Sequence, residues 1–352
     1  MKEVNSIDLL VGCYTEENKN CGLALYKFNL DNGNAIFVND YKINNPSYFT
    51  TNDDGTMIYV VSEEEDKYES AVSAIQLDKS TGEFTLLNSV STKGAAPCYI
   101  SIDNENKYLV TANYLGGSIS VFKLQENGKI DDLIQQIKFD EESIHQERQN
   151  QSHLHCVVYS PSYEHLFATD LGGDKIYKFD VNKDDSDDYL TPSENYLTEI
   201  EEGSGPRHLI FSENKFAYLI SELSGEVKVF DFFNENLLEK QTVVSQYNDA
   251  EGSADIQIHP NGKYLYTSNR LEDDGLTIFK IDQNSGLLTS IGYQETALHP
   301  RNFVISPNGK YLLVASKDSH IIQVFEIDNT TGLLTNINSD IEIDLPVCIK
   351  FI

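Results

Sequence analysis

Short runs of alternating apolar and polar residues, separated by turn residues, follow one another along almost the entire chain. In residues 203–230, for example, a Gly/Pro turn precedes the alternating residues Leu209 and Phe211, and two further apolar runs end at Ser221 and Phe230. Runs of this kind are typical of antiparallel strands that meet at hairpins. Helical periodicity is nearly absent, and only residues 133–145 are ambiguous. The pattern therefore predicts an all-β protein.

The same unit recurs along the chain. Its first strand has the pattern Pro-x-x-apolar-x-apolar, with some substitution of the proline, and begins at seven positions: Pro46, Pro97, Leu154, Pro206, Ser253, Pro300 and Pro346. A second, a third and a weaker fourth strand follow each of the first six starts. A constant period of roughly 50 residues, with four antiparallel strands per unit, fits the blade of a β-propeller. The absence of Trp excludes the WD40 signature but not this architecture.

The two ends of the chain complete one unit between them. The chain begins with a second-strand sequence around residues 8–14 and ends with a lone first strand at residues 347–351. We therefore expect the C-terminal strand to pair with the N-terminal strand, which closes the ring and removes an exposed sheet edge. The prediction is a seven-bladed β-propeller that forms a single domain over residues 1–352.

Composition narrows the choice of partners and compartment. A formal net charge of −30 argues against nucleic acid and anionic membranes as partners. The sequence has no apolar run of membrane-spanning length, and its N-terminal apolar stretch is too short for a signal peptide. The five cysteines are scattered, with no Cys-x-x-Cys motif, which is typical of reduced thiols in the cytoplasm.

Comparison of equivalent positions in the repeats indicates where candidate catalytic and binding residues are concentrated. The position after the first proline holds His155, Arg207 and Arg301, and the position just past the second strand holds Glu222, Arg270 and Lys317. The first and second strands are antiparallel, so both positions lie on one face of the ring, near its axis. The chain has only four arginines, and three of them fall in these positions. This clustering favours an anion-binding pocket, although the same side chains would also suit the bracing of turns.

The remaining candidates carry weaker signals. His153 and His155 lie two residues apart on one face of an extended segment, but no third zinc ligand is evident, and we predict no metal and no cofactor. His155 suits a base or a substrate donor, and His153 a structural or substrate contact. Asn269, next to Arg270, is a further expected substrate contact, whereas Arg148 is expected to be a loop residue. The sequence contains no phosphate loop, dinucleotide fingerprint or nucleophile elbow.

Five segments resemble the propeller-type 6-phosphogluconolactonase family, which is related to carboxy-muconate lactonising enzymes. They are SHLHCVVYSP at 152–161, GSGPRHLIF at 203–211, HPNGKYLYTSNR at 259–270, HPRNFVISPNGKYLLVAS at 299–316 and the terminal PVCIKF. The resemblance implies a seven-bladed propeller that hydrolyses 6-phosphoglucono-1,5-lactone in the oxidative pentose phosphate route without a required metal. The family's proposed active-site residues, a His, two Arg and a Glu, match His155 (or His153), Arg207, Glu222 and Arg270.

Three functional hypotheses follow. In a lactonase, His155 or Glu222 activates water, Arg207 and Arg270 stabilise the oxyanion, and Arg301 and Lys317 hold the phosphate. In a lactonising isomerase acting on a muconate-like dicarboxylate, the same arginines bind two carboxylates. In a non-catalytic binding module, an exposed aromatic patch binds a protein partner, without an excess of arginine over it. We prefer the lactonase hypothesis, in which the binding partner is a small anionic lactone that serves as the substrate.

Overall fold

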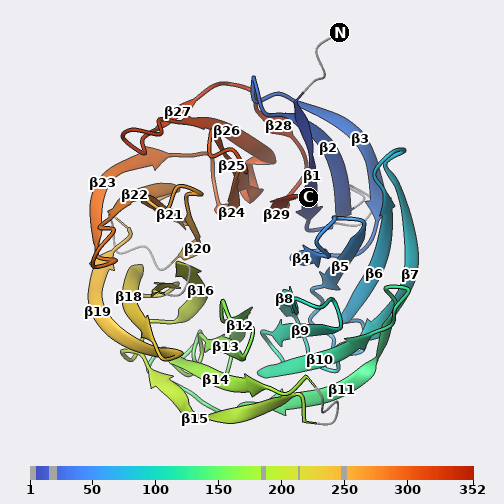
Figure 1. The fold of residues 1–352 in the computed structure, drawn as a ribbon, viewed down its shortest axis with the longest axis vertical. Coiled ribbons are helices and arrows are strands. Elements are labelled where there is room, and N and C mark those ends of the chain that lie inside the picture. Colours follow the sequence, from blue (N-terminus) through green and yellow to red (C-terminus); the bar gives the residue numbers. More distant parts are fainter. Residues whose placement is uncertain (1–4, 16–21, 184–187, 213–214, 247–251) are drawn as a thin grey trace.

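The structure is a computed structural model that describes residues 5–15, 22–183, 188–212, 215–246 and 252–352. Within these residues, 29 β-strands form seven antiparallel sheets, arranged as blades in a ring around a central axis (Figure 1). The prediction of a seven-bladed β-propeller is therefore confirmed. In the part of the chain that the structure describes, no helix is long and apolar enough to cross a membrane.

In each blade the strands follow one another from the axis to the rim. The first blade contains β29 (Pro346–Phe351), β1 (Ser6–Cys13), β2 (Gly22–Asn29) and β3 (Ala35–Lys42), and the second contains β4 (Phe49–Thr51), β5 (Met57–Ser62), β6 (Ala71–Asp78) and β7 (Glu83–Ser91). The third contains β8 (Pro97–Ile102), β9 (Tyr108–Asn113), β10 (Ser118–Leu124) and β11 (Ile130–Lys138). The fourth contains β12 (Leu154–Tyr159), β13 (His165–Asp170), β14 (Lys175–Val181) and β15 (Leu190–Glu199).

The last three blades follow the same order. The fifth blade contains β16 (Pro206–Ser212), β17 (Phe216–Ser221), β18 (Glu226–Phe233) and β19 (Asn236–Val244). The sixth contains β20 (Ser253–Ile258), β21 (Tyr264–Asn269), β22 (Gly275–Ile281) and β23 (Leu288–Glu295). The seventh contains β24 (Pro300–Ile305), β25 (Tyr311–Ser316), β26 (Ile321–Ile327) and β27 (Leu334–Asn336), with the short β28 (Ile341–Glu342) also paired to β26. A 3₁₀ turn, η1 (Lys317–Ser319), follows β25.

The first blade is built from both ends of the chain. Strand β29 pairs antiparallel with β1, with Leu9 opposite Phe351 and Gly12 opposite Cys348. This pairing confirms the expectation that the C-terminal strand closes the ring, and in Figure 1 β29 lies at the axis beside β1. The closure satisfies the backbone groups that an open inner edge would otherwise expose.

Hydrophobic side chains fill the space between neighbouring blades rather than one central core. Each of the seven apolar clusters of the described residues draws its members from two adjacent blades. The cluster that joins the last blade to the first includes Val11, Phe28, Leu313, Val324 and Ile349. Burial of this kind across every blade interface is the main favourable term that holds a propeller together.

The ambiguous stretch at residues 133–145 is a strand followed by a loop. Residues up to Lys138 belong to β11, the outermost strand of its blade. The side chain of Gln135 helps to hold this segment as a strand. Its amide nitrogen donates to the carbonyl of Leu190 at 2.8 Å, and its amide oxygen accepts from the Leu190 N–H at 2.9 Å. The outer strand is thereby tied to the next blade.

Deletion of residues 346–352 should destabilise the protein far more than an ordinary terminal deletion, because it removes β29 and reopens the ring. We expect the midpoint of thermal unfolding to fall by more than 10 °C, on the order of several kcal/mol for a chain of this size. A synthetic peptide with the sequence of residues 346–352 should restore part of the loss when added in excess. An unchanged midpoint after the deletion would contradict this account of closure.

Candidate active site

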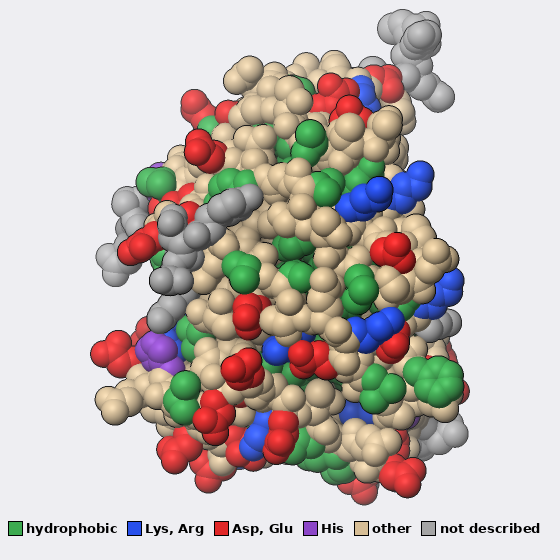
Figure 2. Space-filling view, turned by 90° about the vertical axis from the view of Figure 1, so that its left-hand side faces the viewer, with side chains coloured by type: hydrophobic (Ala, Val, Ile, Leu, Met, Phe, Trp, Pro, Cys, Tyr) green, Lys and Arg blue, Asp and Glu red, His purple; other side chains and the backbone are tan. Residues whose placement is uncertain are grey.

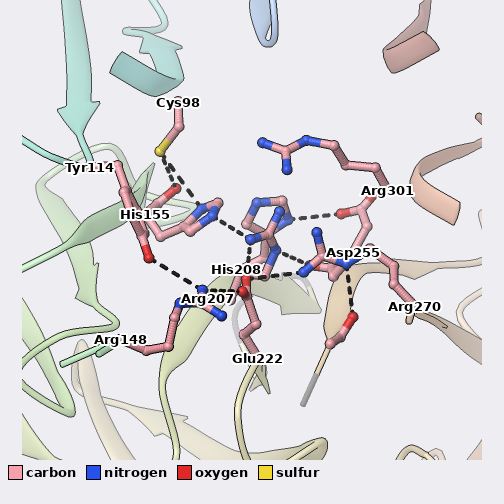
Figure 3. A network of polar contacts seen from close by, with 12 residues as sticks. Cys98, Tyr114, Arg148, His155, Arg207, His208, Glu222, Asp255, Arg270 and Arg301 are labelled. Atoms are coloured by element: carbon pink, nitrogen blue, oxygen red, sulfur yellow. Dashed lines mark hydrogen bonds and ion pairs between the residues drawn. The ribbon is translucent and has the colours of Figure 1, made fainter. Parts of the chain in front are cut away.

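All four arginines of the chain converge on one mouth of the central channel (Figure 3). Arg207 and Arg301 are the second residues of the inner strands β16 and β24, and Arg270 directly follows β21. Arg148 reaches the same place from the loop between β11 and β12. In contrast, acidic side chains are scattered over the outer side of the ring in Figure 2. The mouth is therefore the place where this acidic chain concentrates positive charge.

Glu222 lies at the centre of this arrangement. Its Oε1 is 2.6 Å from Nη2 of Arg148, and its Oε2 pairs with Nη1 of Arg207 and lies 3.3 Å from Nη2 of Arg270. Burial alone would raise the pKa of Glu222, but the guanidiniums of Arg207, Arg270 and Arg148 hold it well below its ordinary value near 4.5. The carboxylate is therefore ionised at neutral pH and binds three guanidinium groups at once.

Two of the three partners of Glu222 are also fixed to the backbone. Nε of Arg207 donates to the carbonyl of Ala254, and Nε of Arg270 donates to the carbonyl of Gly252, both at 2.8 Å. These bonds hold each guanidinium plane in one orientation. Burial lowers the pKa of Arg270 to about 9 even though Glu222 opposes the shift, which means that the site favours additional negative charge.

Arg301 is held more loosely. Its Nη2 is 3.7 Å from Oε2 of Glu63, and its guanidinium carbon lies 5.2 Å from the centre of the Tyr14 ring. In Figure 3 the guanidinium of Arg301 points toward the centre of the group, and no dashed line joins it to another residue drawn there. Four guanidiniums against the carboxylates of Glu222 and Glu63 leave the mouth with a net positive charge.

The tautomers of His153 and His155 are set by different contacts. Nδ1 of His153 lies 3.0 Å from the carbonyl oxygen of Tyr114, which can only accept, so Nδ1 is protonated and Nε2 holds the lone pair. His155 has the same tautomer for a different reason, because its Nε2 accepts an N–H of Arg207. Its Nδ1 lies 3.8 Å from the sulfur of Cys98. Burial and then the charge of Arg207 lower the pKa of His155 well below 6.5, so the ring is neutral.

A second polar layer forms the floor of the mouth. Nδ1 of His208 donates to Asp255 at 2.9 Å, and the amide of Asn302 donates to the same carboxylate at 2.7 Å. The rings of Tyr48 and Tyr99 stack beside His208 with their centres 4.1 Å apart. These side chains come from five different inner strands or the residues that precede them, so their contacts link five blades near the axis of the ring.

The structure brings most of the predicted site residues together. His153, His155, Arg207, Glu222, Arg270 and Arg301 lie at or beside the mouth. Lys317 is linked to the same group through a chain of contacts: it pairs with Asp318 at 3.1 Å, Asp318 accepts from His299 at 2.9 Å, and His299 lies 3.5 Å from Arg270.

Asn269 corrects one expectation. It is the last residue of β21, and its amide is fully engaged inside the blade. The amide nitrogen donates to Ser245 and Thr277, and the oxygen accepts from Ser245 and Ser253. Alternation along a strand turns Asn269 away from the side on which Arg270 lies. With no hydrogen-bonding capacity left for a substrate, it is a structural residue.

Arg148 is the site residue that sequence analysis missed. It does lie in a loop, as expected, but its guanidinium binds Glu222 and also donates to the Tyr114 hydroxyl at 3.3 Å. The loop has no counterpart in the repeat, so a comparison of equivalent positions could not find it. The only feature of the sequence that pointed to Arg148 was the small number of arginines in the chain. Within the described ranges, no three His, Cys, Asp or Glu side chains come together as metal ligands.

Comparison with known proteins identifies relatives over the full length of the chain. The family described as "Lactonase, 7-bladed beta-propeller" matches residues 8–351. A 6-phosphogluconolactonase of Formosa agariphila is 34% identical over 342 residues, which cover 96% of this chain and 97% of the relative. A crystal structure of a putative 6-phosphogluconolactonase from Bacteroides fragilis is 45% identical, with a TM-score of 0.96 over 100% of this chain and 99% of that one. A periplasmic gluconolactonase of Pseudomonas aeruginosa is 30% identical, with a TM-score of 0.92 and 99% of both chains covered.

Glu222→Gln should lower the free energy of unfolding by about 3–5 kcal/mol near neutral pH, because it leaves the buried guanidiniums without their shared counter-charge. Since the folded-state pKa of Glu222 is depressed, its stabilisation is present above pH 4.5 and is lost as the pH falls through the folded-state value. The deficit of the variant should therefore shrink on acidification. Denaturant unfolding across this pH range measures both effects.

The matched control is Glu126→Gln, which removes the same charge from an exposed position. Surface substitutions of this kind usually stay within about 0.5 kcal/mol of the parent protein. If Glu222→Gln costs no more than Glu126→Gln, the Glu222 carboxylate does not organise the arginines of the mouth.

Proposed function

The chain belongs to the lactonase family of seven-bladed β-propellers, and from this premise we propose that it is a lactone hydrolase whose substrate is 6-phospho-D-glucono-1,5-lactone. The product would be 6-phosphogluconate, an intermediate of the pentose phosphate pathway. One observation carries the proposal: three guanidinium groups bind one buried carboxylate, and a neutral imidazole lies against one of them. The group offers donors for a developing oxyanion beside an acceptor for a proton of water.

His155 is the proposed general base. As the oxygen of a water molecule attacks the carbonyl carbon of the lactone, Nε2 of His155 takes one proton of that water. The depressed pKa of His155 keeps this nitrogen unprotonated at neutral pH. In the resting site Nε2 accepts an N–H of Arg207, so that N–H must turn toward the substrate before the imidazole can act.

Arg207 and Arg270 are the proposed donors to the oxyanion. The attack of water turns the carbonyl oxygen of the neutral lactone into an anion, and guanidinium N–H groups can stabilise it because a backbone carbonyl holds the Nε of each arginine in place. The bond between the carbonyl carbon and the ring oxygen then breaks. The ring oxygen leaves as a hydroxyl group and takes the proton from the imidazolium of His155.

Glu222 is proposed to orient the arginines rather than to act as the base. A carboxylate whose pKa lies well below 4.5 is a weak proton acceptor, and both of its oxygens already bind guanidinium groups. Its charge instead keeps Arg207 and Arg270 close to each other in spite of their repulsion. Of the two roles left open by the sequence, base or orienter, the contacts of Glu222 favour the second.

Arg301, Lys317 and His153 are proposed contacts of the remaining oxygens of the substrate. Arg301 and Lys317 each lie beside a carboxylate, Glu63 at 3.7 Å and Asp318 at 3.1 Å. A donor and an acceptor side by side suit sugar hydroxyl groups, which both accept and donate. Nε2 of His153 offers a further acceptor for such a hydroxyl.

One observation favours a second candidate substrate. The Pseudomonas aeruginosa relative is named a periplasmic gluconolactonase, a name that specifies a lactone without a phosphate group. We propose the cytoplasm as the location of this chain, and the four free cysteines among the described residues, Cys13, Cys98, Cys156 and Cys348, support a reducing compartment. Cys21 lies outside the described residues. Rates on freshly prepared phosphorylated and unphosphorylated lactone decide between the two substrates.

His155→Asn should reduce kcat for lactone hydrolysis by about 10²-fold or more, the usual effect of losing a general base. The Asn amide keeps a donor near the position of Nδ1 but supplies no group in place of Nε2. The measurement is the initial rate on freshly prepared lactone, corrected for spontaneous hydrolysis, with thermal unfolding as a check of the fold.

His153→Asn is the control for this change. Its amide can still donate to the Tyr114 carbonyl, so we expect a raised KM with kcat within a few-fold of the parent enzyme. A large loss of kcat in His153→Asn together with full activity in His155→Asn would exchange the two roles. Full activity of both variants would refute an imidazole base.

The acid limb of the rate profile should lie well below pH 6.5. The base must be neutral to act, and burial together with Arg207 lowers the pKa of His155 below this value. The value of kcat/KM for the parent enzyme should therefore stay constant between pH 7 and 6 and fall only at lower pH. A descending limb with its midpoint at or above pH 6.5 would mean that a group with an ordinary or raised pKa is the base.

A further inference from the structure

Arg148 differs from the other two partners of Glu222 in how it is held. The side chains of Arg207 and Arg270 are 4% and 7% exposed, whereas that of Arg148 is 36% exposed. The hydrogen bonds of the Arg148 guanidinium go to two side chains, Glu222 and Tyr114, and not to a backbone carbonyl. Arg148 is therefore the solvent-facing member of the cluster and can exchange its partner at the lowest cost.

The loop that carries Arg148 is firmly anchored at the next residue. Gln149 is fully buried, and its amide donates to the carbonyl of Leu171 at 2.9 Å and to Asp174 at 2.8 Å. Asp174 also accepts the N–H groups of Gly203 and Gly205, both at 2.7 Å, in the turn that leads to Arg207. The buried hydrogen bonds of Asp174 thus fix the backbone of Arg148 relative to that of Arg207. The guanidinium of Arg148 remains the part that can move.

The charges of the cluster allow Arg148 to leave Glu222. When Arg148 turns away, Arg207 and Arg270 still neutralise the buried carboxylate. A guanidinium offers several donors in one plane, an arrangement that matches the oxygens of a phosphate group. Arg301 and Lys317 suit a dianion less well, because Glu63 and Asp318 lie beside them and would repel it.

The positions of the two guanidiniums fit the two ends of a phosphorylated lactone. Arg148 and Arg207 bind opposite oxygens of the Glu222 carboxylate, so the width of the carboxylate and one hydrogen-bond length on each side separate them. A six-membered lactone ring with one exocyclic carbon can bridge them, with its carbonyl at Arg207 and its phosphate at Arg148.

We infer that Arg148 determines specificity for a phosphorylated lactone by exchanging Glu222 for the phosphate of the substrate. This inference rests on the proposed function, since it concerns the same site. It assigns the phosphate to a residue outside the repeat, in place of Arg301 and Lys317. Because Arg148 acts on binding and not on the reacting carbon, its loss should raise KM for the phosphorylated lactone much more than it lowers kcat.

The first experiment measures binding and needs no turnover. The midpoint of thermal unfolding is compared in 6-phosphogluconate and in gluconate at equal concentration, for the parent protein, Arg148→Gln, Arg148→Lys and the exposed control Lys123→Gln. We expect 6-phosphogluconate to raise the midpoint more than gluconate in the parent and in the control. This difference should disappear in Arg148→Gln and persist in part in Arg148→Lys. Equal midpoints in the parent protein, or an unchanged difference in Arg148→Gln, would overturn the inference.

The second experiment measures the ratio of kcat/KM on 6-phosphogluconolactone to that on gluconolactone. Arg148→Gln should lower this ratio at least tenfold relative to the parent enzyme and the Lys123→Gln control, and an unchanged ratio would overturn the inference. A parent protein that hydrolyses neither lactone would contradict the proposed function alone. The comparison of 6-phosphogluconate with gluconate would then still decide whether Arg148 recognises the phosphate.

Discussion

The pairing of β29 with β1 is the constraint on which the rest of the structure depends. A propeller blade buries its apolar faces only against neighbouring blades, so an open ring would leave two large faces in water. Closure also sets the site, because it fixes the inner strands around one axis. Arg301 of the last blade thereby lies beside Glu63 of the second and over Tyr14, which directly follows β1 in the first, although hundreds of residues separate them along the chain. The positive mouth is therefore a product of the closed ring, not of any local motif.

The same geometry explains how a chain with a net charge of −30 can attract an anion. Surface charges are screened by salt within about 8–10 Å, so acidic groups on the outer side of the ring act only weakly at the mouth. The arginines are mostly buried, where the dielectric constant is lower and their mutual field is less screened. Placing every arginine of the chain at one position makes the local sign of the potential independent of the overall charge.

The repeat allowed the fold and most of the candidate site to be predicted, because similar blades put equivalent residues at equivalent places. It located Arg207, Arg301, Glu222 and Arg270 without any coordinates. It failed where the repeat stops: Arg148 belongs to a loop between blades, and only the structure shows that Gln149 anchors this loop beside the mouth. A second limit is the alternation of side chains, by which Asn269 faces the blade interior while its neighbour Arg270 faces the site. The tautomers of the two histidines could not be predicted either, since each depends on one contact with a distant residue.

In the proposed mechanism, the excess of positive charge would give the site a preference for the transition state. In the resting protein one buried carboxylate faces three guanidiniums, and the pKa of Arg270 falls to about 9 because burial and the neighbouring arginines outweigh Glu222. An additional negative charge is therefore favourable at this place. A neutral lactone carbonyl supplies none, whereas the oxyanion formed when water attacks it supplies one full charge. Groups that gain interaction only as this charge develops lower the barrier without tightening the binding of the substrate. On this argument, the incomplete neutralisation of the arginines is what would make the site catalytic rather than merely anion-binding.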